Sequence, residues 1–248
     1  MNLGIGGRRA AGAAASRGLG FGVATALAAE GVRVAMCGRH RETIDEAARR
    51  AGNGAVPLVA DVGTPASAAA FVRAAADALG GVDILVTNAG GPPAGTFATT
   101  ELAQYQTAIE LNCLSVIAMC DAAVPAMQAQ GWGRVVAITS IAVRQPIAEL
   151  ILSNTARAGA TGFLKTLARE VAADGVTVNS LQPGLHDTER VRDLRGGDPT
   201  GAAAGIPAGT LGRPDDFGAI AAFLCSDQAR FLTGTAIPVD GGAHAGLL

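Results

Sequence analysis

The chain has 248 residues, which is enough for one large α/β domain and too few for two domains of ordinary size. Hydrophobic residues make up 49% of it and charged residues 16%, so we expect a sizeable core; the net charge of -2 gives no reason to expect nucleic acid or an anionic membrane as a partner. No apolar run reaches the about 18 residues of a membrane span, and the start of the chain is unlike a leader, so we expect a cytoplasmic protein.

Short apolar runs of strand length alternate with longer segments of helical spacing throughout the chain. Most of these runs are apolar at every position, which is typical of strands buried on both faces. The alternation predicts right-handed βαβ crossovers, and therefore a single α/β domain at 1–248 with a Rossmann-like, doubly wound parallel sheet covered by helices on both faces. The expected strands are 8–15, 32–37, 55–60, 82–87, 134–139, 176–181 and 235–240, and the expected helices are 23–31, 65–79, 101–129, 154–173 and 214–227.

The glycine-rich segment AASRGLGFG at 14–22 lies between the first expected strand and the first expected helix. Backbone N–H groups in such a turn, together with the helix dipole, favour binding of a diphosphate. In dinucleotide-binding folds an acidic residue after the second strand binds the ribose 2′-hydroxyl, whereas an arginine there accommodates a 2′-phosphate. Arg39 holds that position and Arg17 is a second cation in the loop, so we expect NADP(H) rather than NAD(H). Two solvated surface arginines are the alternative.

Residues 185–212 are rich in Gly and Pro and show little periodicity. An irregular stretch of this length in a compact domain is more often a functional lid than a scaffold element. We therefore expect a mobile substrate lid here, with a disordered excursion as the alternative.

Side chains that bind metals or form disulfides are few and scattered. No CxxC pair or Cys–His cluster is present, so we interpret the cysteines as buried, reduced thiols and expect no metal site. His40 and His244 have no chemical partners nearby, and we expect both at the surface. The single tyrosine, Tyr105, is interpreted as core or interface packing. The cysteines are Cys37, Cys113, Cys120 and Cys225.

Several short motifs occur in an order and spacing that make the chain resemble a short-chain dehydrogenase/reductase almost from end to end. The glycine-rich loop is similar to the TGxxxGxG of that family, NAG at 88–90 follows the fourth strand, and PG at 183–184 follows the sixth. The resemblance is greatest to the 3-oxoacyl-carrier-protein reductases. It implies a small-molecule carbonyl or hydroxyl substrate and a homo-oligomer, tetramer or dimer, formed through 101–129 and 154–173.

The resemblance also assigns roles to single positions. Asp61 matches the aspartate that contacts adenine, Asn112 matches the helix asparagine, and Ser140 matches the catalytic serine. The residues that it implies for cofactor binding are Ser16, Arg17, Gly18, Leu19, Gly20, Arg39, Asp61, Val62, Asn88, Ala89, Gly90, Arg157, Pro183, Gly184 and Thr188.

The glycine-rich loop departs from the family pattern at its start. Alignment on Gly18 and Gly20 puts Ala14 at the first glycine of the motif and Ala13 at its threonine. The Cβ of Ala14 either fits because the local φ is negative, or crowds the adenosine side of the cofactor.

The larger departure concerns the catalytic pair. In the family a tyrosine thirteen residues beyond the serine transfers the proton at the substrate oxygen, and a lysine four residues further lowers its pKa and holds the nicotinamide ribose. The matching residues here are Ser153 and Arg157. An aliphatic hydroxyl is a far weaker acid than a phenol, and an arginine stays charged and cannot relay a proton, although it can bind ribose hydroxyls.

The best replacement proton donor in the sequence is His186, because an imidazole has a pKa near neutrality. Asp187 either orients it or is an ordinary loop carboxylate. We favour a solvated loop histidine over a catalytic one. A water held by Asn112 and Ser140 is the other candidate donor.

Three functions stay open at this point. The first is an NADP(H)-linked oxidoreductase in which proton transfer is rearranged. The second is a non-redox enzyme on the same scaffold, such as an isomerase, dehydratase or cyclase. The third is a catalytically silent subunit that pairs with an active relative in a hetero-oligomer. The catalytic residues expected for the first function are Asn112, Ser140, Ser153, Arg157 and His186.

Overall fold

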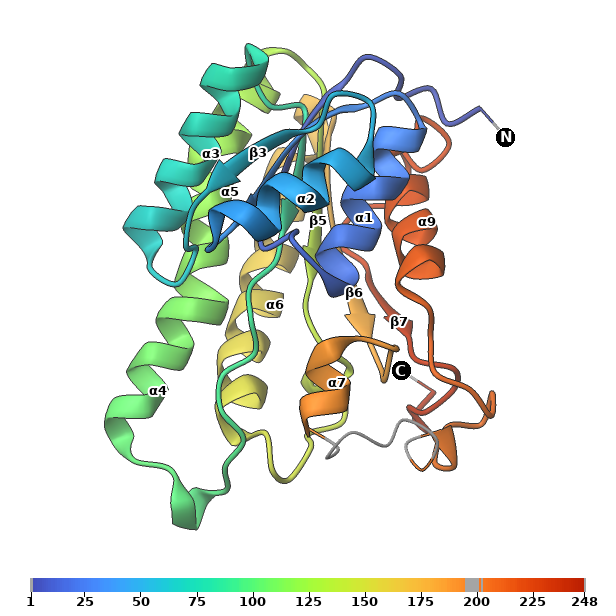
Figure 1. Ribbon diagram of the computed structural model, residues 1–248. Coiled ribbons are helices and arrows are strands. Elements are labelled where there is room, and N and C mark those ends of the chain that lie inside the picture. The colour runs from blue at the N-terminus through green and yellow to red at the C-terminus, as the bar shows by residue number, and fades with distance from the viewer. Residues whose placement is uncertain (1, 195–200, 202, 248) are drawn as a thin grey trace.

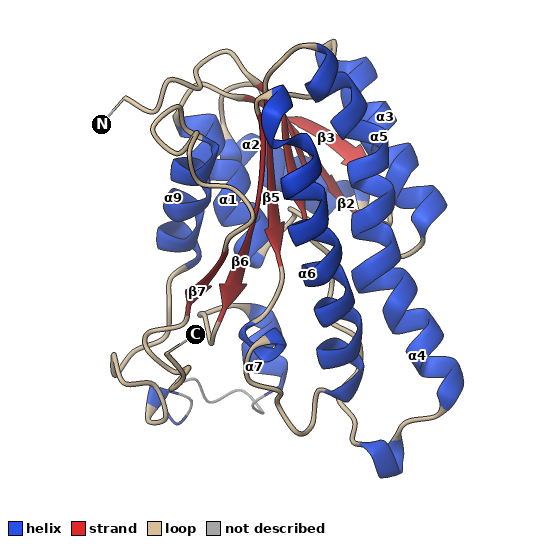
Figure 2. Cartoon of the chain, turned by 180° about the vertical axis from the view of Figure 1, so that it is seen from behind, coloured by secondary structure: helices blue, strands red, loops and turns tan. Residues whose placement is uncertain are grey.

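The computed structural model describes residues 2–194, 201 and 203–247. Its centre is a seven-stranded sheet, parallel throughout, with the strand order β3-β2-β1-β4-β5-β6-β7 (Figures 1 and 2). This confirms the expected doubly wound α/β fold. The strands are β1 Arg9–Gly12, β2 Arg33–Gly38, β3 Val56–Val59, β4 Ile84–Thr87, β5 Gly133–Ile138, β6 Val176–Pro183 and β7 Ala236–Val239.

Helices cover both faces of the sheet and divide the core into two layers. Helices α1, α2 and α9 lie on one face of the sheet, and α3, α5 and α6 lie on the other (Figures 1 and 2). Their apolar side chains form one core layer on each face. The helices are α1 Gly18–Ala29, α2 Arg41–Ala51, α3 Pro65–Leu79, α4 Leu102–Ile109, α5 Ser115–Ala129, α6 Ile151–Val171, α7 Glu189–Leu194 and α9 Pro214–Cys225.

The expected helix at 101–129 is not a regular helix along its whole length. A π-helical turn at Glu110–Leu114 separates α4 from α5. Such turns insert an extra residue into the hydrogen-bond ladder and are frequent at functional sites. Periodicity alone does not detect this single-turn change, and the prediction of a continuous α-helix was wrong there.

By length and composition, Leu102–Ala129 is long and apolar enough to cross a membrane, with a mean hydropathy of 1.5. The expectation that no segment reaches this threshold is therefore corrected. The finding is weak evidence for a membrane span, because 44% of the apolar window is buried inside the protein and α5 packs on the core beside α3.

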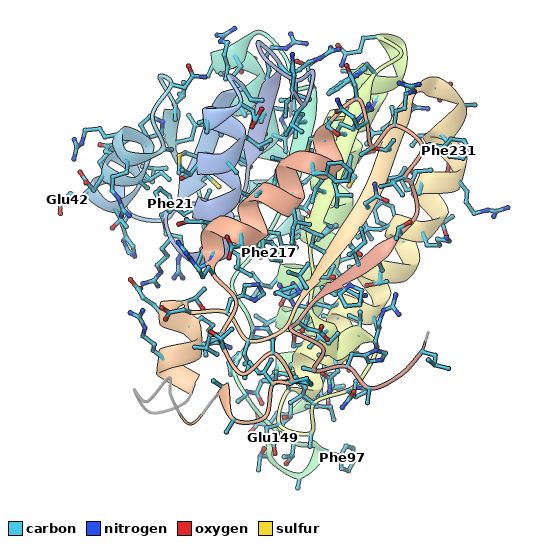
Figure 3. The ribbon with its side chains drawn as sticks, turned by 90° about the vertical axis from the view of Figure 1, so that its right-hand side faces the viewer. Phe21, Glu42, Phe97, Glu149, Phe217 and Phe231 are labelled. Carbon is cyan, nitrogen blue, oxygen red and sulfur yellow. The ribbon has the colours of Figure 1, made fainter. Side chains whose placement is uncertain are left out.

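Helices α1 and α9 pack with their backbones in close contact. A Cβ built on Gly218 would lie 2.6 Å from the carbonyl carbon of Gly22, and one built on Gly22 would lie 2.8 Å from that of Pro214. Real side chains essentially never come so near to backbone, so glycine at both positions lets the helices touch. Next to the crossing, the fully buried Phe217 points inward from α9 (Figure 3). The contact fixes the position of α1.

The strand order places a topological switch between β1 and β4. The chain leaves β1 towards β2 and β3 on one side, and β4 to β7 continue on the other. In open parallel sheets, the loops that follow the strands at such a point form a crevice for ligands. The segments that follow β1, β2, β4, β5 and β6 carry most of the residues implied for the site.

Two expectations stay predictions: that 1–248 forms one domain, and that 185–212 is a mobile substrate lid. Of the expected lid, residues 195–200 and 202 lie outside the described residues. Its described part holds α7 and a short β-bridge between His186 and Gly212.

Candidate active site

The loop after β1 is held between two strands. The backbone N–H of Ala13 donates to the carbonyl oxygen of Val86 at 3.0 Å, and that of Ala15 donates to Cys37 at 2.8 Å. At the start of α1, a Cβ on Gly20 would lie 2.5 Å from the carbonyl oxygen of Ala14, so only glycine allows the helix to begin this close to the loop.

Among the described residues, no side chain accepts a hydrogen bond from the free N–H groups in the first turn of α1. Arg17 is the N-cap residue, in extended conformation, and its side chain makes no capping hydrogen bond. No acidic residue lies in the first turn either. Unpaired N–H groups and the positive end of a helix dipole attract an anion. This turn therefore fits a diphosphate.

Ala14 has a φ of 45°, in the left-handed region that disfavours a Cβ. The expectation that the Cβ of Ala14 fits because the local φ is negative is therefore wrong. Its carbonyl oxygen accepts a hydrogen bond from Nδ2 of Asn88 at 3.2 Å, which ties the loop to the end of β4. The strained alanine is held by this bond and by the strand contacts of its neighbours.

Replacing this alanine by glycine is expected to stabilise the protein. Ala14→Gly removes a left-handed strain of about 1–2 kcal/mol and adds a backbone-entropy cost of about 0.5–1 kcal/mol. The net gain in free energy of unfolding should be about 0.5–1 kcal/mol, measured by urea denaturation without nucleotide. The control is Ala15→Gly, at a residue without positive φ, which should lose stability. A loss in both variants would contradict the strain.

The two arginines expected at the adenosine end differ in their partners. Arg17 forms an exposed ion pair with Glu189 of α7, so the loop after β1 is joined to the segment after β6. Arg39 is exposed at the end of β2 and has no ion pair within the described part of the chain. Asp61 is exposed and accepts a hydrogen bond from the N–H of Gly63 at 2.9 Å.

The π-turn brings Asn112 against the loop after β4. Its side chain is buried, and Nδ2 donates to the carbonyl oxygen of Gly90 at 3.1 Å. Its Oδ1 is buried and has no hydrogen-bond partner among the described residues. Because buried acceptors are nearly always satisfied, this oxygen marks a position for a water or a ligand hydroxyl.

Ser140 follows β5 and is half-buried. Its Oγ accepts a hydrogen bond from the N–H of Ala142 at 3.1 Å and caps the 3₁₀ turn Ile141–Val143. A hydroxyl that accepts one bond can still donate its proton. The turn therefore fixes Ser140 with one donor free.

Ser153 and Arg157 lie one turn apart on the buried side of α6 and are 7% and 9% exposed. Nη1 of Arg157 donates to the carbonyl oxygen of Ile138 at 3.0 Å. Burial and the nearby Arg190 cation lower the pKa of Arg157 to about 10, so it stays charged at neutral pH. An arginine that stays charged does not relay a proton.

The residues around the end of β6 meet the start of α1. A Cβ on Gly184 would lie 2.7 Å from the Cβ of Asp240, so glycine is needed where β6 passes the C-terminal segment. Thr188 approaches the first turn of α1, since a Cβ on Gly18 would lie 3.6 Å from its Cγ2. Thr188 thus lies beside the N-terminus of α1, although the two are far apart in the sequence.

His186 is not the solvated loop residue we favoured. Its side chain is buried, Nδ1 lies 3.1 Å from the carbonyl oxygen of Gly184, and the ring meets Phe217 edge-on at 5.2 Å. A Cβ on Gly212 would lie 2.5 Å from the ring, which shows how closely that segment covers it. Asp187 pairs with Arg192 at 2.7 Å and does not orient the imidazole.

The burial of His186 should make stability depend on pH. Desolvation lowers its pKa from 6.5, so the unfolded chain binds the proton more readily than the folded one. The stability that the neutral imidazole contributes is fully present above pH 6.5, the pKa of the unfolded state. It is lost as the pH falls from there through the lower pKa of the folded state. Between about pH 7.5 and 5.5, the free energy of unfolding should therefore fall less in the His186→Gln variant than in the unmutated protein. Urea denaturation at each pH measures it. His40→Gln, at an exposed site, should retain the original dependence.

Sequence reasoning missed Arg190, which lies on α7. Its Nη2 donates to the carbonyl oxygen of Pro92 at 2.9 Å, and its guanidinium packs beside Gly91. Arg190 thus bridges α7 and the loop after β4. An isolated arginine in a segment without periodicity gives no signal that could have identified it.

The remaining expectations concern side chains away from this crevice. Tyr105 is half-buried and packs with Ala108, Leu152 and Ala156, as expected for a packing residue. His40 is exposed, whereas His244 is half-buried. Within the described ranges no group of three or more metal-ligating side chains occurs.

The cysteines are free, and three of the four are buried. Burial raises the pKa of these three thiols to about 12, so they are unreactive. The fourth, Cys113, is half-exposed and corrects the expectation that all four are buried.

Comparisons with known proteins agree with this geometry. Residues 12–244 match the family model described as Enoyl-(Acyl carrier protein) reductase. The chain is 34% identical over 230 residues to the 3-oxoacyl-[acyl-carrier-protein] reductase FabG of Escherichia coli (strain K12), and 32% identical over 230 residues to the enzyme of the same name from Vibrio cholerae. Each alignment covers 93% of this chain and 94% of the relative.

Among solved structures, the chain is similar to L-sorbose reductase from Gluconobacter frateurii in complex with NADPH and L-sorbose. The TM-score is 0.92 at 31% sequence identity, and the alignment covers 100% of both chains. The fold of this chain therefore has a counterpart over the whole length of a protein whose structure was solved with NADPH.

Proposed function

The chain belongs to the short-chain dehydrogenase/reductase family, and from this premise we propose that it is an NADP(H)-linked oxidoreductase in which Ser153 and Arg157 take the places of the tyrosine and lysine. The observation that carries the cofactor assignment is the uncapped first turn of α1 at the switch point, together with Arg39 at the end of β2. Activity of the NAD(P)-dependent type on a carbonyl or hydroxyl substrate follows from the family itself.

Different residues around α1 would bind different parts of the cofactor. The first turn of α1 binds the diphosphate, Arg39 binds the 2′-phosphate, and Asp61 with Val62 contacts the adenine. When bound, NADPH supplies the hydride. The remaining contacts are assigned to Ser16, Arg17, Leu19, Asn88, Ala89, Gly90, Arg157, Pro183, Gly184 and Thr188.

The substrate oxygen is assigned to the end of β5. The Ser140 hydroxyl, which is free to donate, gives a hydrogen bond to this oxygen. The Oδ1 of Asn112, which has no partner among the described residues, accepts a hydrogen bond from a water. Of the two proposed proton donors, this water is favoured over His186. The imidazole is enclosed by Phe217, and its Nδ1 faces a backbone carbonyl. Ser153 adds a hydroxyl to the wall of the crevice and, as a weak acid, makes proton transfer slow.

The quaternary structure stays a proposal. A homotetramer or dimer would use the exposed sides of α4, α5 and α6, and the expected cytoplasmic location is likewise a prediction. If the exchanged pair has abolished redox activity, the same surfaces suit a silent subunit paired with an active relative. A non-redox reaction is the other alternative that this exchange allows.

The test is thermal unfolding in the presence of NADPH or NADH, since a ligand that binds only the folded state raises its melting temperature. NADPH should raise the melting temperature more than NADH does. Absence of a shift with either nucleotide would remove the oxidoreductase assignment. A shift without hydride transfer to any carbonyl would favour the silent subunit or the non-redox enzyme.

Arg39→Gln should weaken NADPH binding about tenfold, because a charge-assisted hydrogen bond is lost, and should leave NADH binding nearly unchanged. Titration calorimetry measures both affinities. The matched control is Arg73→Gln, at an exposed arginine of α3 away from the crevice, which should change neither affinity. Equal losses for both nucleotides in Arg39→Gln would contradict recognition of the 2′-phosphate.

A further inference from the structure

A groove lies between α6 and the last two strands of the sheet, where the edge strand β7 extends beyond the cover of that helix (Figure 2). Its volume is about 230 Å³. Leu164 and Val178 contribute buried apolar side chains to it, and most of the remaining lining is polar. No acidic residue is among the described residues that line the groove, and none of them has been assigned to the cofactor or the substrate. The groove is therefore separate from the crevice.

Two cationic side chains line this groove. Nε of Arg144 donates to Oε1 of Gln182 at 2.7 Å, and its Nη2 donates to the carbonyl oxygen of Ala236 at 2.8 Å. Nζ of Lys165 donates to the carbonyl oxygen of Gly234, also at 2.8 Å. Because Gly234 and Ala236 are two residues apart, their Cα atoms are separated by at most about 7 Å. Both cations are thus bound to neighbouring points of one segment, and each keeps N–H donors beyond those that these bonds use.

A buried hydroxyl lines the groove as well. Ser180 of β6 is 3% exposed, and its side chain lies on the same face of the strand as that of Val178, two residues earlier. The backbone N–H of Ser180 donates to the carbonyl oxygen of Thr235 at 2.9 Å, whereas its Oγ has no hydrogen-bond partner among the described residues. Buried polar groups are nearly always paired with protein, water or a ligand. This hydroxyl therefore marks a position for a ligand oxygen inside the groove.

We propose that this groove is a binding site for a phosphate group, either free or carried by a small phosphorylated molecule. The guanidinium of Arg144 and the ammonium of Lys165 bind phosphate oxygens from the two exposed sides, and the hydroxyl of Ser180 donates to one from the strand. A phosphate group has three or more acceptor oxygens that point in different directions, so it can satisfy three separate donors, whereas a carboxylate offers two oxygens in one plane. The site does not involve the nicotinamide cofactor, and its test is independent of the proposed function.

The experiment measures thermal unfolding of the full chain against the concentration of inorganic phosphate or glycerol 3-phosphate, with sodium chloride at equal ionic strength as the reference. At least one of the two should raise the melting temperature above that in chloride, because it binds the folded state. The affinity derived from this rise should fall about tenfold in Lys165→Gln and in Arg144→Gln, the value of a charge-assisted hydrogen bond. The matched control is Arg169→Gln, an exposed cation one turn further along α6, which should keep the original affinity.

Ser180→Ala separates binding from folding. It removes a hydroxyl without a partner among the described residues, so stability in the absence of phosphate should stay nearly unchanged. Its affinity for phosphate should also fall about tenfold, because a hydrogen bond to a charged group is lost. If Arg144→Gln does not fold, Lys165→Gln and Ser180→Ala decide the matter.

Loss of affinity confined to the groove variants supports the site, and the probe that binds more tightly then shows whether the phosphate is free or esterified. Stabilisation no greater than that in chloride would overturn it. Affinity unchanged in the groove variants would place the phosphate elsewhere, such as at the first turn of α1, and would overturn it too. An equal loss in Arg169→Gln would show a general attraction to positive charge instead of a site.

Discussion

Gly218→Ala is expected to destabilise the protein by about 2 kcal/mol. The new methyl group would lie 2.6 Å from the carbonyl carbon of Gly22, and the atoms that it meets are backbone, which cannot rotate away as a side chain can. Overpacking of this kind costs about 3 kcal/mol, from which the better helix propensity of alanine subtracts about 1 kcal/mol. Helices α1 and α9 must then separate, and because α1 carries the diphosphate site, NADPH binding should weaken as well.

A second glycine provides the matched control. Gly162 lies in the interior of α6, and a Cβ built there would meet nothing within 4 Å. Gly162→Ala should therefore stabilise the protein by about 0.5–1 kcal/mol through helix propensity alone. Urea denaturation followed by circular dichroism measures both variants. Equal stability of the two would show that the α1–α9 contact is not as close as its backbone geometry indicates.

This contact illustrates what the sequence could not predict. The segment 214–227 is apolar at helical spacing, which predicts a helix that packs on the sheet, and α9 does so at Pro214–Cys225. Nothing in the spacing of Gly22 and Gly218 shows that they face each other, because nearly two hundred residues separate them. The strands, by contrast, are short apolar runs that can be recognised locally, and all seven were predicted within a few residues.

The same distinction applies to the site. The glycine-rich turn and the end of β2 are local patterns, and they meet at the crevice as expected. The burial of His186 depends on Phe217 and Gly212, which reach it from another part of the chain, so its neighbours in the sequence suggested a solvated residue. The unpaired Oδ1 of Asn112 likewise depends on a π-turn that has no sequence signal.

Ser153→Tyr combined with Arg157→Lys is expected to raise kcat by about 10²–10⁴, the usual contribution of a positioned general acid. A phenol has a reference pKa near 10, which an adjacent cation lowers towards the working pH, whereas a serine hydroxyl does not ionise in this range. Positions 153 and 157 lie one turn apart on the same side of α6, so the new lysine would lie beside the new phenol.

A phenyl ring at the same position separates proton donation from packing. Ser153 is 7% exposed, so any large side chain must turn into the crevice or displace its neighbours. Ser153→Phe with Arg157→Lys has almost the same volume as the tyrosine variant and no acidic proton, and its kcat should stay at or below that of the unmutated protein. Only the tyrosine variant should show kcat for carbonyl reduction falling as the pH rises through the pKa of the phenol, because the protonated form is the donor. Equal rates in the two variants would mean that the proton already comes from elsewhere, and the water at Oδ1 of Asn112 would then be a sufficient donor.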